Sequence, residues 1–304
     1  MRNAFADEVT RLAKEDPRVM LLSGDIGNRL FDKLRAQSPS QFLNCGVAEQ
    51  NMMGVAAGMG LSGLRPIVYT IAPFTTSRCL EQIKVDVAYH RAPVIIVGTG
   101  SGLSYASLGP THHSLEDFAI LRAIPNLQIL APWDTISLRV CLRMAMQTNK
   151  PTYIRIGKKG EADLCEAHSV PAIGSGLTLF EGTQLCIIAV GTAAHEAQLA
   201  GKRLKQLGVK VEVIITHTVK PSPLLLFDNL LHQFDRFVTV EEHARIGGFG
   251  EAFLSRLAMR GMNKRIICLG TDDRFMAVVG SQSYARSHFG IDSGSIVQAA
   301  STLL

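Results

Sequence analysis

The sequence predicts an α/β protein built from two doubly wound domains, each a mostly parallel sheet with helices on both faces. Short runs rich in Val and Ile recur along the chain without polar alternation, as expected for strands buried on both faces of a parallel sheet. Segments with helical periodicity separate these runs, which is the pattern of crossover connections between parallel strands. We find no internal repeat, heptad array or low-complexity tract in the sequence.

The first domain is expected to span residues 1–165. Its helix-like segments lie near residues 3–14, 48–62, 75–90, 114–123 and 134–148. The predicted strands between them are 19–23, 41–45, 66–70, 94–98, 127–130 and 152–156. Helix 48–62 is rich in Gly and Ala, which weakens it intrinsically, so we expect another backbone to approach it closely.

A linker is expected at residues 166–182, because the pattern lapses around 158–182. That stretch contains Lys158-Lys159-Gly160-Glu161, Pro171 and a Gly-Ser-Gly at 174–176. A second α/β domain is predicted for residues 183–304, with strands at 185–190, 211–215, 236–240 and 265–269.

Composition excludes several function classes. Hydrophobic residues make up 47% of the 304 residues and charged residues 19%, with a mean hydropathy of +0.17, which suggests extensive subunit interfaces. The formal charge of +5 is spread along the chain, so neither nucleic acid nor a membrane surface is an expected partner. The N-terminus lacks a signal-peptide pattern, no apolar stretch is long enough to cross a bilayer, and the six cysteines form no CxxC pair. We therefore expect a cytoplasmic protein with reduced thiols.

Neither of the two glycine-rich motifs is interpreted as a nucleotide-binding site. The stretch 98–102 reads Gly-Thr-Gly-Ser-Gly, but Leu103 follows and no helix opens there, so it is an active-site loop candidate and not a dinucleotide fingerprint. The stretch 247–250 lies near Glu241-Glu242-His243 and is interpreted as tight packing at a domain or subunit contact. The sequence contains neither a P-loop nor a nucleophile elbow.

A metal site is not predicted on this chain. Four potential ligands lie close together in the sequence: His112, His113, Glu116 and Asp117. Adjacent histidines point in different directions on regular structure, and neither an HExxH motif nor a third distant ligand accompanies them.

Several motifs between residues 40 and 135 occur in a recognisable order. They are Gly46-Val47-Ala48-Glu49-Gln50-Asn51, Thr70-Ile71-Ala72-Pro73-Phe74, Arg78-Cys79-Leu80-Glu81-Gln82-Ile83, Gly109-Pro110-Thr111-His112 and Ala131-Pro132-Trp133-Asp134. On these motifs the sequence resembles the central and C-terminal domains of transketolases, most closely those encoded as two chains. The resemblance covers essentially the whole chain and is looser after residue 180. It implies a thiamine-diphosphate-binding (pyrimidine module) fold followed by a transketolase C-terminal-like domain.

The resemblance implies catalytic roles for Glu49 and His112. Glu49 would bond N1′ of the thiamine aminopyrimidine and promote the tautomer that accepts the C2 proton. His112 would face the substrate and bond its oxygens. Phe74 would stack on the aminopyrimidine with Ile71 beside it. The remaining cofactor-binding residues expected from the resemblance are Asp25 and Gln82.

The sequence departs from the family pattern on the substrate side. Leu108 stands where transketolases have an acidic residue that recognises a substrate hydroxyl, and Gly100 replaces a phosphate-binding histidine. Lys158 corresponds to a phosphate-binding arginine and lacks its bidentate fork, although Arg155 could substitute for it. A serine that contacts the phosphate in the family maps near Arg29 of this chain. We therefore expect a sugar or sugar-phosphate substrate that is deoxy, branched or nucleotide-linked.

The half of the cofactor site that binds the diphosphate is missing from the sequence. In this family a Gly-Asp-Gly motif and a later Asn hold Mg²⁺ and the diphosphate, and Gly24-Asp25-Ile26-Gly27 is not that motif. The resemblance thus implies thiamine diphosphate as cofactor, Mg²⁺ ligands on a partner chain, and an N-terminal-half, diphosphate-binding transketolase subunit as partner. An α2β2 heterotetramer is the simplest assembly.

The expected function is that of the β (C-terminal-half) subunit of a heteromeric transketolase, which transfers a two-carbon ketol unit between sugars. Two other interpretations share the motifs. One is the E1 β subunit of a 2-oxoacid dehydrogenase, which also pairs with an α chain; 1-deoxyxylulose-phosphate synthase is a weaker alternative because it is normally one longer chain. The other is a non-catalytic, orphan transketolase half.

Overall fold

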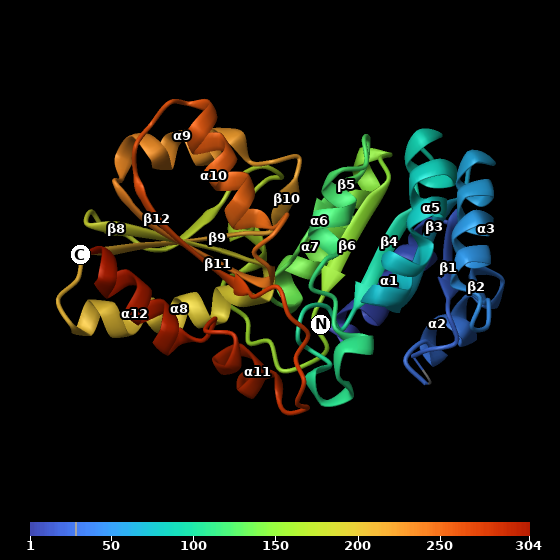
Figure 1. The fold of residues 1–304 in the computed structure, drawn as a ribbon. Coiled ribbons are helices and arrows are strands. Elements are labelled where there is room, and N and C mark those ends of the chain that lie inside the picture. Colours follow the sequence, from blue (N-terminus) through green and yellow to red (C-terminus); the bar gives the residue numbers. More distant parts are fainter. Residues whose placement is uncertain (28) are drawn as a thin grey trace.

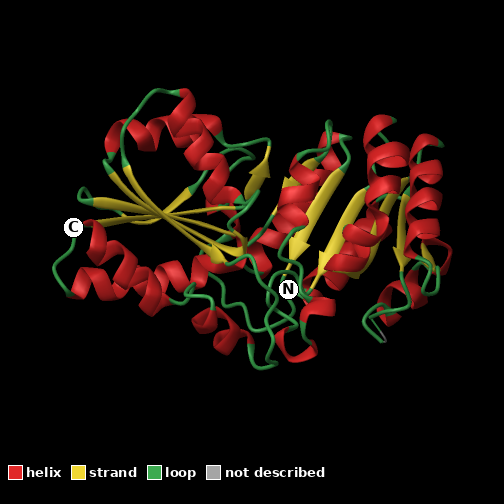
Figure 2. Cartoon of the chain, in the orientation of Figure 1, coloured by secondary structure: helices red, strands yellow, loops and turns green. Residues whose placement is uncertain are grey.

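The chain folds into two α/β units that lie side by side (Figure 1). The computed structural model describes residues 1–27 and 29–304. Helices cover both faces of each sheet, so the strands run through the middle of each unit (Figure 2). The predicted fold class is confirmed: both sheets are mostly parallel and connected through helices. Among the described residues, no helix is both long enough and apolar enough to span a membrane.

The first unit contains a sheet of seven strands in the order β10-β5-β6-β4-β3-β1-β2. All of its neighbouring pairs are parallel except β10 with β5. Its own strands match the predicted runs within a few residues: β1 (Val19–Ser23), β2 (Phe42–Asn44), β3 (Arg65–Ile71), β4 (Ile95–Thr99), β5 (Gln128–Leu130) and β6 (Thr152–Ile156). The longer helices around this sheet are α1 (Arg2–Glu15), α2 (Asp32–Gln37), α3 (Glu49–Leu61), α6 (Asp117–Arg122) and α7 (Thr135–Thr148).

The single helix predicted for residues 75–90 is wrong. A short helix α4 (Ala72–Thr75) ends at Thr76, whose backbone leaves the helical region (φ −109°, ψ −82°). The hydroxyls of Thr75 and Thr76 both donate to the carbonyl oxygen of Ala72, at 2.9 and 2.8 Å, and such bonds compete with helix continuation. The chain resumes in three further pieces: η2 (Ser77–Cys79), α5 (Leu80–Gln82) and the π-helical η3 (Ile83–Tyr89).

The second unit has a sheet of five strands in the order β12-β11-β8-β9-β7. Its strands are β7 (Leu177–Phe180), β8 (Leu185–Val190), β9 (Val211–Thr216), β11 (Arg236–Ala244) and β12 (Arg265–Thr271). Its longer helices are α8 (Ala194–Gln206), α9 (Leu224–Gln233), α10 (Phe249–Met259), α11 (Gln282–His288) and α12 (Ser293–Leu303). β7 pairs antiparallel with β9, which places the first strand of this sheet inside the segment predicted as linker, 166–182.

The two units share a sheet and a core. Strand β10 (Thr218–Lys220) comes from the second half of the chain and pairs antiparallel with β5 at the edge of the first sheet. The Lys220 ammonium also donates to the carbonyl oxygens of Arg122 and Ile124 in the first unit. One buried apolar cluster contains residues of both units, including Ile129, Cys186 and Phe227. These contacts fix the second unit against the β5 edge of the first sheet.

Candidate active site

The expected site residues follow the carboxyl ends of parallel strands, which meet at one edge of the first sheet. Asp25 follows β1, and Glu49 opens the helix after β2. Phe74 lies in the short helix after β3, and His112 lies in the loop after β4. Ligands of open α/β sheets usually bind at this edge, in a crevice that the loops form outside the carboxyl ends of the strands.

Glu49 is a buried carboxylate with one cationic partner. It is the first residue of α3, and only 3% of its side chain is exposed. Nη1 of Arg78 donates to its Oε2 at 2.7 Å. Position 24 beside it is a glycine, where a Cβ would lie 3.1 Å from the Thr70 hydroxyl and 3.4 Å from Cγ of Glu49. The Thr70 hydroxyl is buried and has no hydrogen-bond partner among the described residues.

Phe74 presents its ring beside this carboxylate. The guanidinium carbon of Arg78 lies 3.9 Å from the ring centroid, so the cation covers one face of the ring. The imidazole of His112 meets the same ring edge-on, with centroids 5.5 Å apart. Ile71, the last residue of β3, is half-buried and directly precedes α4, the short helix that carries Phe74. The structure therefore brings His112 against Phe74, and Arg78 joins Phe74 to Glu49.

His112 is presented by a loop that is tied at its base. Backbone hydrogen bonds join Gly102 and Ser114 in both directions, each 3.1 Å long. Helix α6 consequently begins at Asp117, later than the predicted start at 114. Within the loop, the Thr111 hydroxyl lies 3.0 Å from Nδ1 of His112. The Nε2 nitrogen of the neighbouring His113, which is 6% exposed, has no partner among the described residues.

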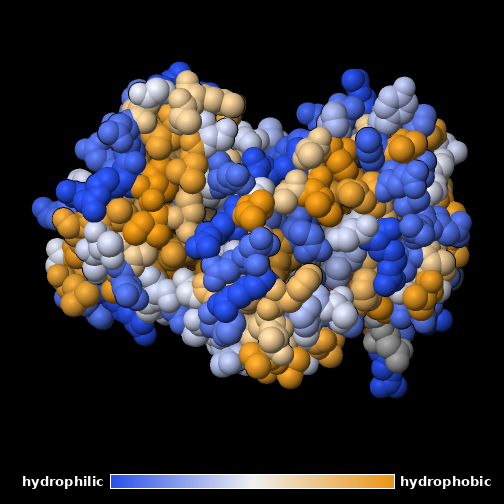
Figure 3. All heavy atoms as spheres, viewed as in Figure 1, coloured by the Kyte–Doolittle hydropathy of each residue, from blue (hydrophilic) through white to orange (hydrophobic). Residues whose placement is uncertain are grey.

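Exposed apolar side chains, including Leu108, lie on the expected substrate side of the site. Leu108 lies in the same loop as His112 and is 51% exposed. Loops after β4 and β12 meet here: Gly280 N donates to the Ala106 carbonyl oxygen at 3.3 Å. The patch they share also includes Phe275, Val278 and Val279, and Figure 3 shows apolar side chains gathered along this lower edge of the molecule.

A basic cavity, of about 580 Å³, is lined by four cationic side chains (Arg2, Arg29, Lys158 and Lys159) and by one acid, Glu161, which pairs with the N-terminal ammonium. The Lys158 ammonium lies 4.5 Å from the centroid of the Tyr105 ring. Gly100 has φ +69°, and a Cβ at this position would collide with that ring. The phosphate-binding histidine of the family therefore cannot be accommodated at position 100 beside Tyr105. The sequence shows the glycine, but only the structure shows the Tyr105 ring that requires it.

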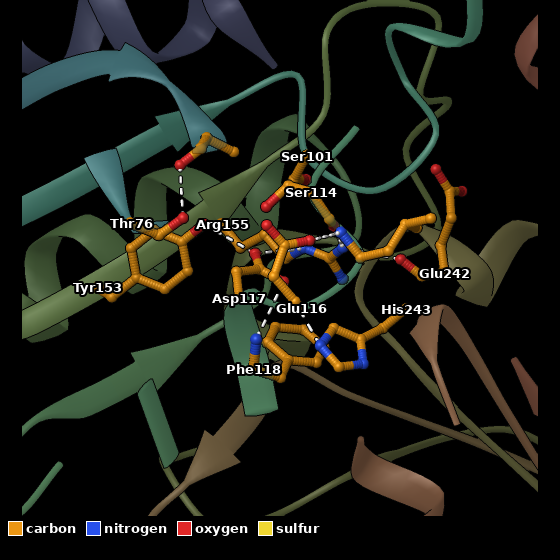
Figure 4. A network of polar contacts seen from close by, with 12 residues as sticks. Thr76, Ser101, Ser114, Glu116, Asp117, Phe118, Tyr153, Arg155, Glu242 and His243 are labelled. Atoms are coloured by element: carbon orange, nitrogen blue, oxygen red, sulfur yellow. Dashed lines mark hydrogen bonds and ion pairs between the residues drawn. The ribbon is translucent and has the colours of Figure 1, made fainter. Parts of the chain in front are cut away.

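Arg155 does not line this cavity but lies in the contact between the two units, beside Asp117 and Glu242 (Figure 4). Its side chain is 5% exposed and pairs with Asp117 at 3.0 Å. It donates to the carbonyl oxygens of Ser114 and Glu242 at 2.8 and 2.7 Å, and its guanidinium stacks on Phe118, 4.3 Å from the ring centroid. Because these contacts occupy it, Arg155 does not join Lys158 in the basic cavity.

Burial sets the protonation of this interdomain network. Burial raises the pKa of Asp117, against the opposing effect of the Arg155 charge. Burial, together with the Arg155 charge, lowers the pKa of His243 to about 3. Glu241 accepts hydrogen bonds from the backbone of Phe249 and Gly250, yet burial still raises its pKa to about 7. The glycines at 247–250 pack tightly here, as predicted, because a Cβ on Gly247 would collide with Ala119 of the first unit.

Asp25 and Gln82 take separate positions around the pocket. Asp25 is exposed, accepts a hydrogen bond from Asn44 at 3.0 Å and lines a cavity of about 400 Å³ with Arg29. Gln82 is half-buried, and its Oε1 has no partner among the described residues. No group of three potential metal ligands is assembled within residues 1–27 and 29–304.

Comparison with known proteins identifies the two units. The family model for the transketolase pyrimidine-binding domain matches residues 1–160, and the model for the transketolase C-terminal domain matches residues 174–296. The chain belongs to the transketolase family. The resemblance inferred from the motifs is thereby confirmed.

The similar proteins include single chains of two-chain transketolases. The chain is 33% identical to one of the subunits of the apulose-4-phosphate transketolase of Phocaeicola vulgatus, over 98% of this chain and 96% of that one. It is 31% identical to a subunit of the 6-deoxy-6-sulfo-D-fructose transketolase of Clostridium sp. strain MSTE9, over 99% and 93% of the two chains. A solved split-gene transketolase, an inactive beta4 tetramer, superimposes with a TM-score of 0.89 at 29% identity and covers 100% of this chain and 97% of its own.

The groups gathered here fit the pyrimidine half of thiamine diphosphate, the cofactor on which the transketolase family depends. The buried Glu49 carboxylate can bond a ring nitrogen, the buried Thr70 hydroxyl is unpartnered among the described residues, and the Phe74 ring offers an aromatic face for stacking. The sequence motifs contain Arg78 but indicate no role for it, and Tyr105 lies outside them. The proximity of Arg78 to Glu49 depends on the break at Thr76, which periodicity could not reveal.

Proposed function

We propose that this chain is the pyrimidine-binding subunit of a two-chain transketolase, and that Glu49, Phe74 and His112 are its catalytic and cofactor-binding residues. The observation that carries the proposal is that a buried carboxylate, an aromatic face and a loop histidine converge at one sheet edge. These are the groups needed to hold an aminopyrimidine and to face a substrate above it.

Glu49 is the proposed proton-handling residue. Thiamine diphosphate, when bound, supplies the stabilisation of charge at the substrate carbon that the side chains cannot supply. Glu49 holds the ring through N1′ and shares a proton with it, in a position shielded from water at the head of α3. Phe74 fixes the plane of the ring by stacking. Ile71, Asp25 and Gln82 complete the proposed cofactor contacts around these two residues.

His112 and Leu108 face the substrate in this proposal. The tied loop between Gly102 and Ser114 holds the His112 imidazole over the Phe74 ring edge, where it can bond substrate oxygens. Leu108 is exposed in the same loop and cannot accept a hydrogen bond. A sugar that lacks one hydroxyl, or carries it elsewhere, avoids leaving that group unpaired against Leu108.

The basic cavity is the proposed site for an anionic end of the sugar. Arg29 and Lys158, two residues expected to bind substrate, line it together. Arg155 is left out of this proposed substrate site because it is enclosed between the two units. The relatives named for apulose-4-phosphate and 6-deoxy-6-sulfo-D-fructose act on modified sugars that carry a phosphate or sulfonate, which supports a modified, anionic sugar as the substrate.

The proposed partner is an N-terminal-half transketolase chain that binds the diphosphate and supplies the Mg²⁺ ligands. The split relatives support this division, and we propose an α2β2 assembly that acts in the cytoplasm. Unpaired thiols at all six cysteines fit a reducing compartment. We propose two units at residues 1–165 and 183–304; the connection between them, 166–182, also contributes strand β7 to the second sheet.

The test is ketol transfer by this chain mixed with the N-terminal-half transketolase chain of the same organism. Activity that requires both chains and that is lost in Glu49→Gln supports the proposal. Acyl transfer from a 2-oxoacid to a lipoyl carrier would favour the dehydrogenase E1 alternative. Absence of turnover in the mixture, with every anionic ketose tested, would favour a non-catalytic half.

A further inference from the structure

Arg78 lies where the proposed function places the aminopyrimidine of the cofactor. Its guanidinium covers the face of Phe74 at 3.9 Å, and its Nη1 bonds Oε2 of Glu49 at 2.7 Å. A guanidinium is planar and carries N–H donors at its rim, so it can satisfy both partners of an aminopyrimidine at once. We propose that Arg78 is an internal occupant of the pyrimidine pocket, which the cofactor must displace. This inference rests on the proposed role of the pocket.

The burial of Glu49 explains why the occupant is a cation. Only 3% of the Glu49 side chain is exposed, and a buried carboxylate without a partner is costly. Arg78 is the cation that pairs with Glu49 among the described residues. It lies on the turn that follows the break at Thr76. The guanidinium thus compensates the charge of Glu49 until another donor reaches its carboxylate.

Arg78 is held loosely enough to be exchanged. Its side chain is 40% exposed, and its interactions among the described residues are one charged hydrogen bond, to Glu49, and one aromatic face, that of Phe74. A displaced guanidinium on the short turn Ser77–Cys79 regains water at its exposed rim. The incoming ring replaces both lost contacts, because it bonds the same carboxylate and covers the same phenyl face.

Because Arg78 returns to Glu49 and Phe74 when the cofactor leaves, the pyrimidine pocket is closed in the absence of cofactor. The pyrimidine end of the cofactor gains the contacts with Glu49 and Phe74 only after those of Arg78 are lost, so its net contribution to affinity is reduced. A site that is open for only a fraction of the time binds more weakly by that fraction. The affinity must then come from the diphosphate end, so retention of thiamine compounds depends on the partner that binds this end.

The probe for this inference is thiamine without its diphosphate, titrated by calorimetry into the chain alone. Arg78→Ala opens the pocket and is expected to bind thiamine at least about tenfold more tightly than the unmodified chain. Arg78→Lys retains a charge beside Glu49 but loses the flat face over Phe74, so its affinity is expected to lie between the two. Arg245→Ala removes an exposed, paired arginine of the second unit and is expected to leave thiamine binding unchanged.

The double variant Arg78→Ala with Glu49→Gln is expected to lose the gain, because the uncovered carboxylate is what the ring would bond. Arg78→Ala that binds thiamine no more tightly than the unmodified chain, including no binding by either, overturns the inference. Ketol transfer by the two-chain mixture is a separate readout. Turnover without tighter thiamine binding by Arg78→Ala rejects the role of Arg78 and leaves the proposed function standing. Tighter thiamine binding without turnover supports the role of Arg78 and rejects the proposed function.

Discussion

Two buried carboxylates in this chain pair with arginines, and they differ in how far the arginine is enclosed. Glu49 pairs with Arg78, whose side chain is 40% exposed and makes one hydrogen bond. Asp117 pairs with Arg155, which is 5% exposed and also donates to two carbonyl oxygens. The first pair lies at the open edge of the sheet, whereas the second lies between the two units (Figure 4).

Exposure of the cation separates an exchangeable ion pair from a fixed one. Water can solvate the rim of Arg78 when it leaves Glu49, so that pair can give way to a ligand. Arg155 cannot leave without stranding Asp117, which is fully buried, and a stranded buried charge is costly. The same two residue types therefore serve a binding pocket in one place and the cohesion of the domains in the other.

The largest expected effect comes from Glu49→Gln at the exchangeable pair. Glutamine keeps the shape of the side chain but cannot share a proton with N1′ of the cofactor. We expect turnover by the two-chain mixture to fall by roughly 10²–10⁴-fold, the usual contribution of general acid–base catalysis. Steady-state ketol transfer measures it, with the far-ultraviolet circular dichroism unchanged. A variant that retains more than about a tenth of the activity would remove Glu49 from the mechanism.

Breaking the fixed pair is expected to cost stability. Arg155→Met leaves Asp117 buried without its cation, and such losses cost about 3–5 kcal/mol. Urea unfolding of the chain measures the change in the free energy of unfolding. Arg245→Met, at the exposed pair with Asp272, is the matched control and should change stability by less than about 1 kcal/mol. Equal effects of the two variants would contradict the distinction between enclosed and exposed pairs.

The fixed network also predicts a pH dependence. The pKa of His243 is lowered from 6.5 to about 3 by burial, so the folded chain keeps it neutral while the unfolded chain takes up a proton below about pH 6.5. Acid therefore favours unfolding, and no such loss occurs above that pH. Relative to His243→Gln, the unmodified chain should lose about 2–3 kcal/mol of unfolding free energy between pH 6.5 and about pH 4.5.

Urea unfolding at the two pH values checks this dependence. The comparison is made as a difference between the two proteins because Glu241, whose pKa is raised to about 7, titrates in both. Parallel pH profiles for the two proteins would show that His243 is charged in the folded state.

The smallest expected effect is on substrate choice. Leu108→Asp restores an acceptor beside His112 on an exposed position, so folding should be unaffected. We expect roughly a tenfold shift in kcat/KM toward ketoses that carry the hydroxyl which Leu108 cannot bond. Competition between a deoxy and a hydroxylated ketose measures the shift. An unchanged ratio would mean that Leu108 does not contact the substrate.

Much of the fold and part of the site could be predicted from sequence. Val/Ile-rich runs reported the parallel strands because strands buried on both faces have little other composition available. The motifs then placed Glu49, Phe74 and His112 at the carboxyl edge, and the structure brings them together. Local order along the chain carried this information, since each residue follows its own strand end.

The predictions that failed depend on contacts that periodicity and spacing do not report. The 75–90 helix breaks because two threonine hydroxyls engage the Ala72 carbonyl, a local competition with the helix. The orientation of Arg155 depends on Asp117 and on the Glu242 carbonyl oxygen of the second unit. None of these partners can be inferred from the spacing around the residue itself.

Whether the cofactor site is divided between two chains is decided by calorimetric titration of thiamine diphosphate and Mg²⁺ into this chain, into the N-terminal-half transketolase chain, and into their mixture. We expect tight binding by the mixture alone, weakened by Glu49→Gln in this chain. Tight binding by this chain without its partner, or binding by the mixture that Glu49→Gln leaves unchanged, would contradict it.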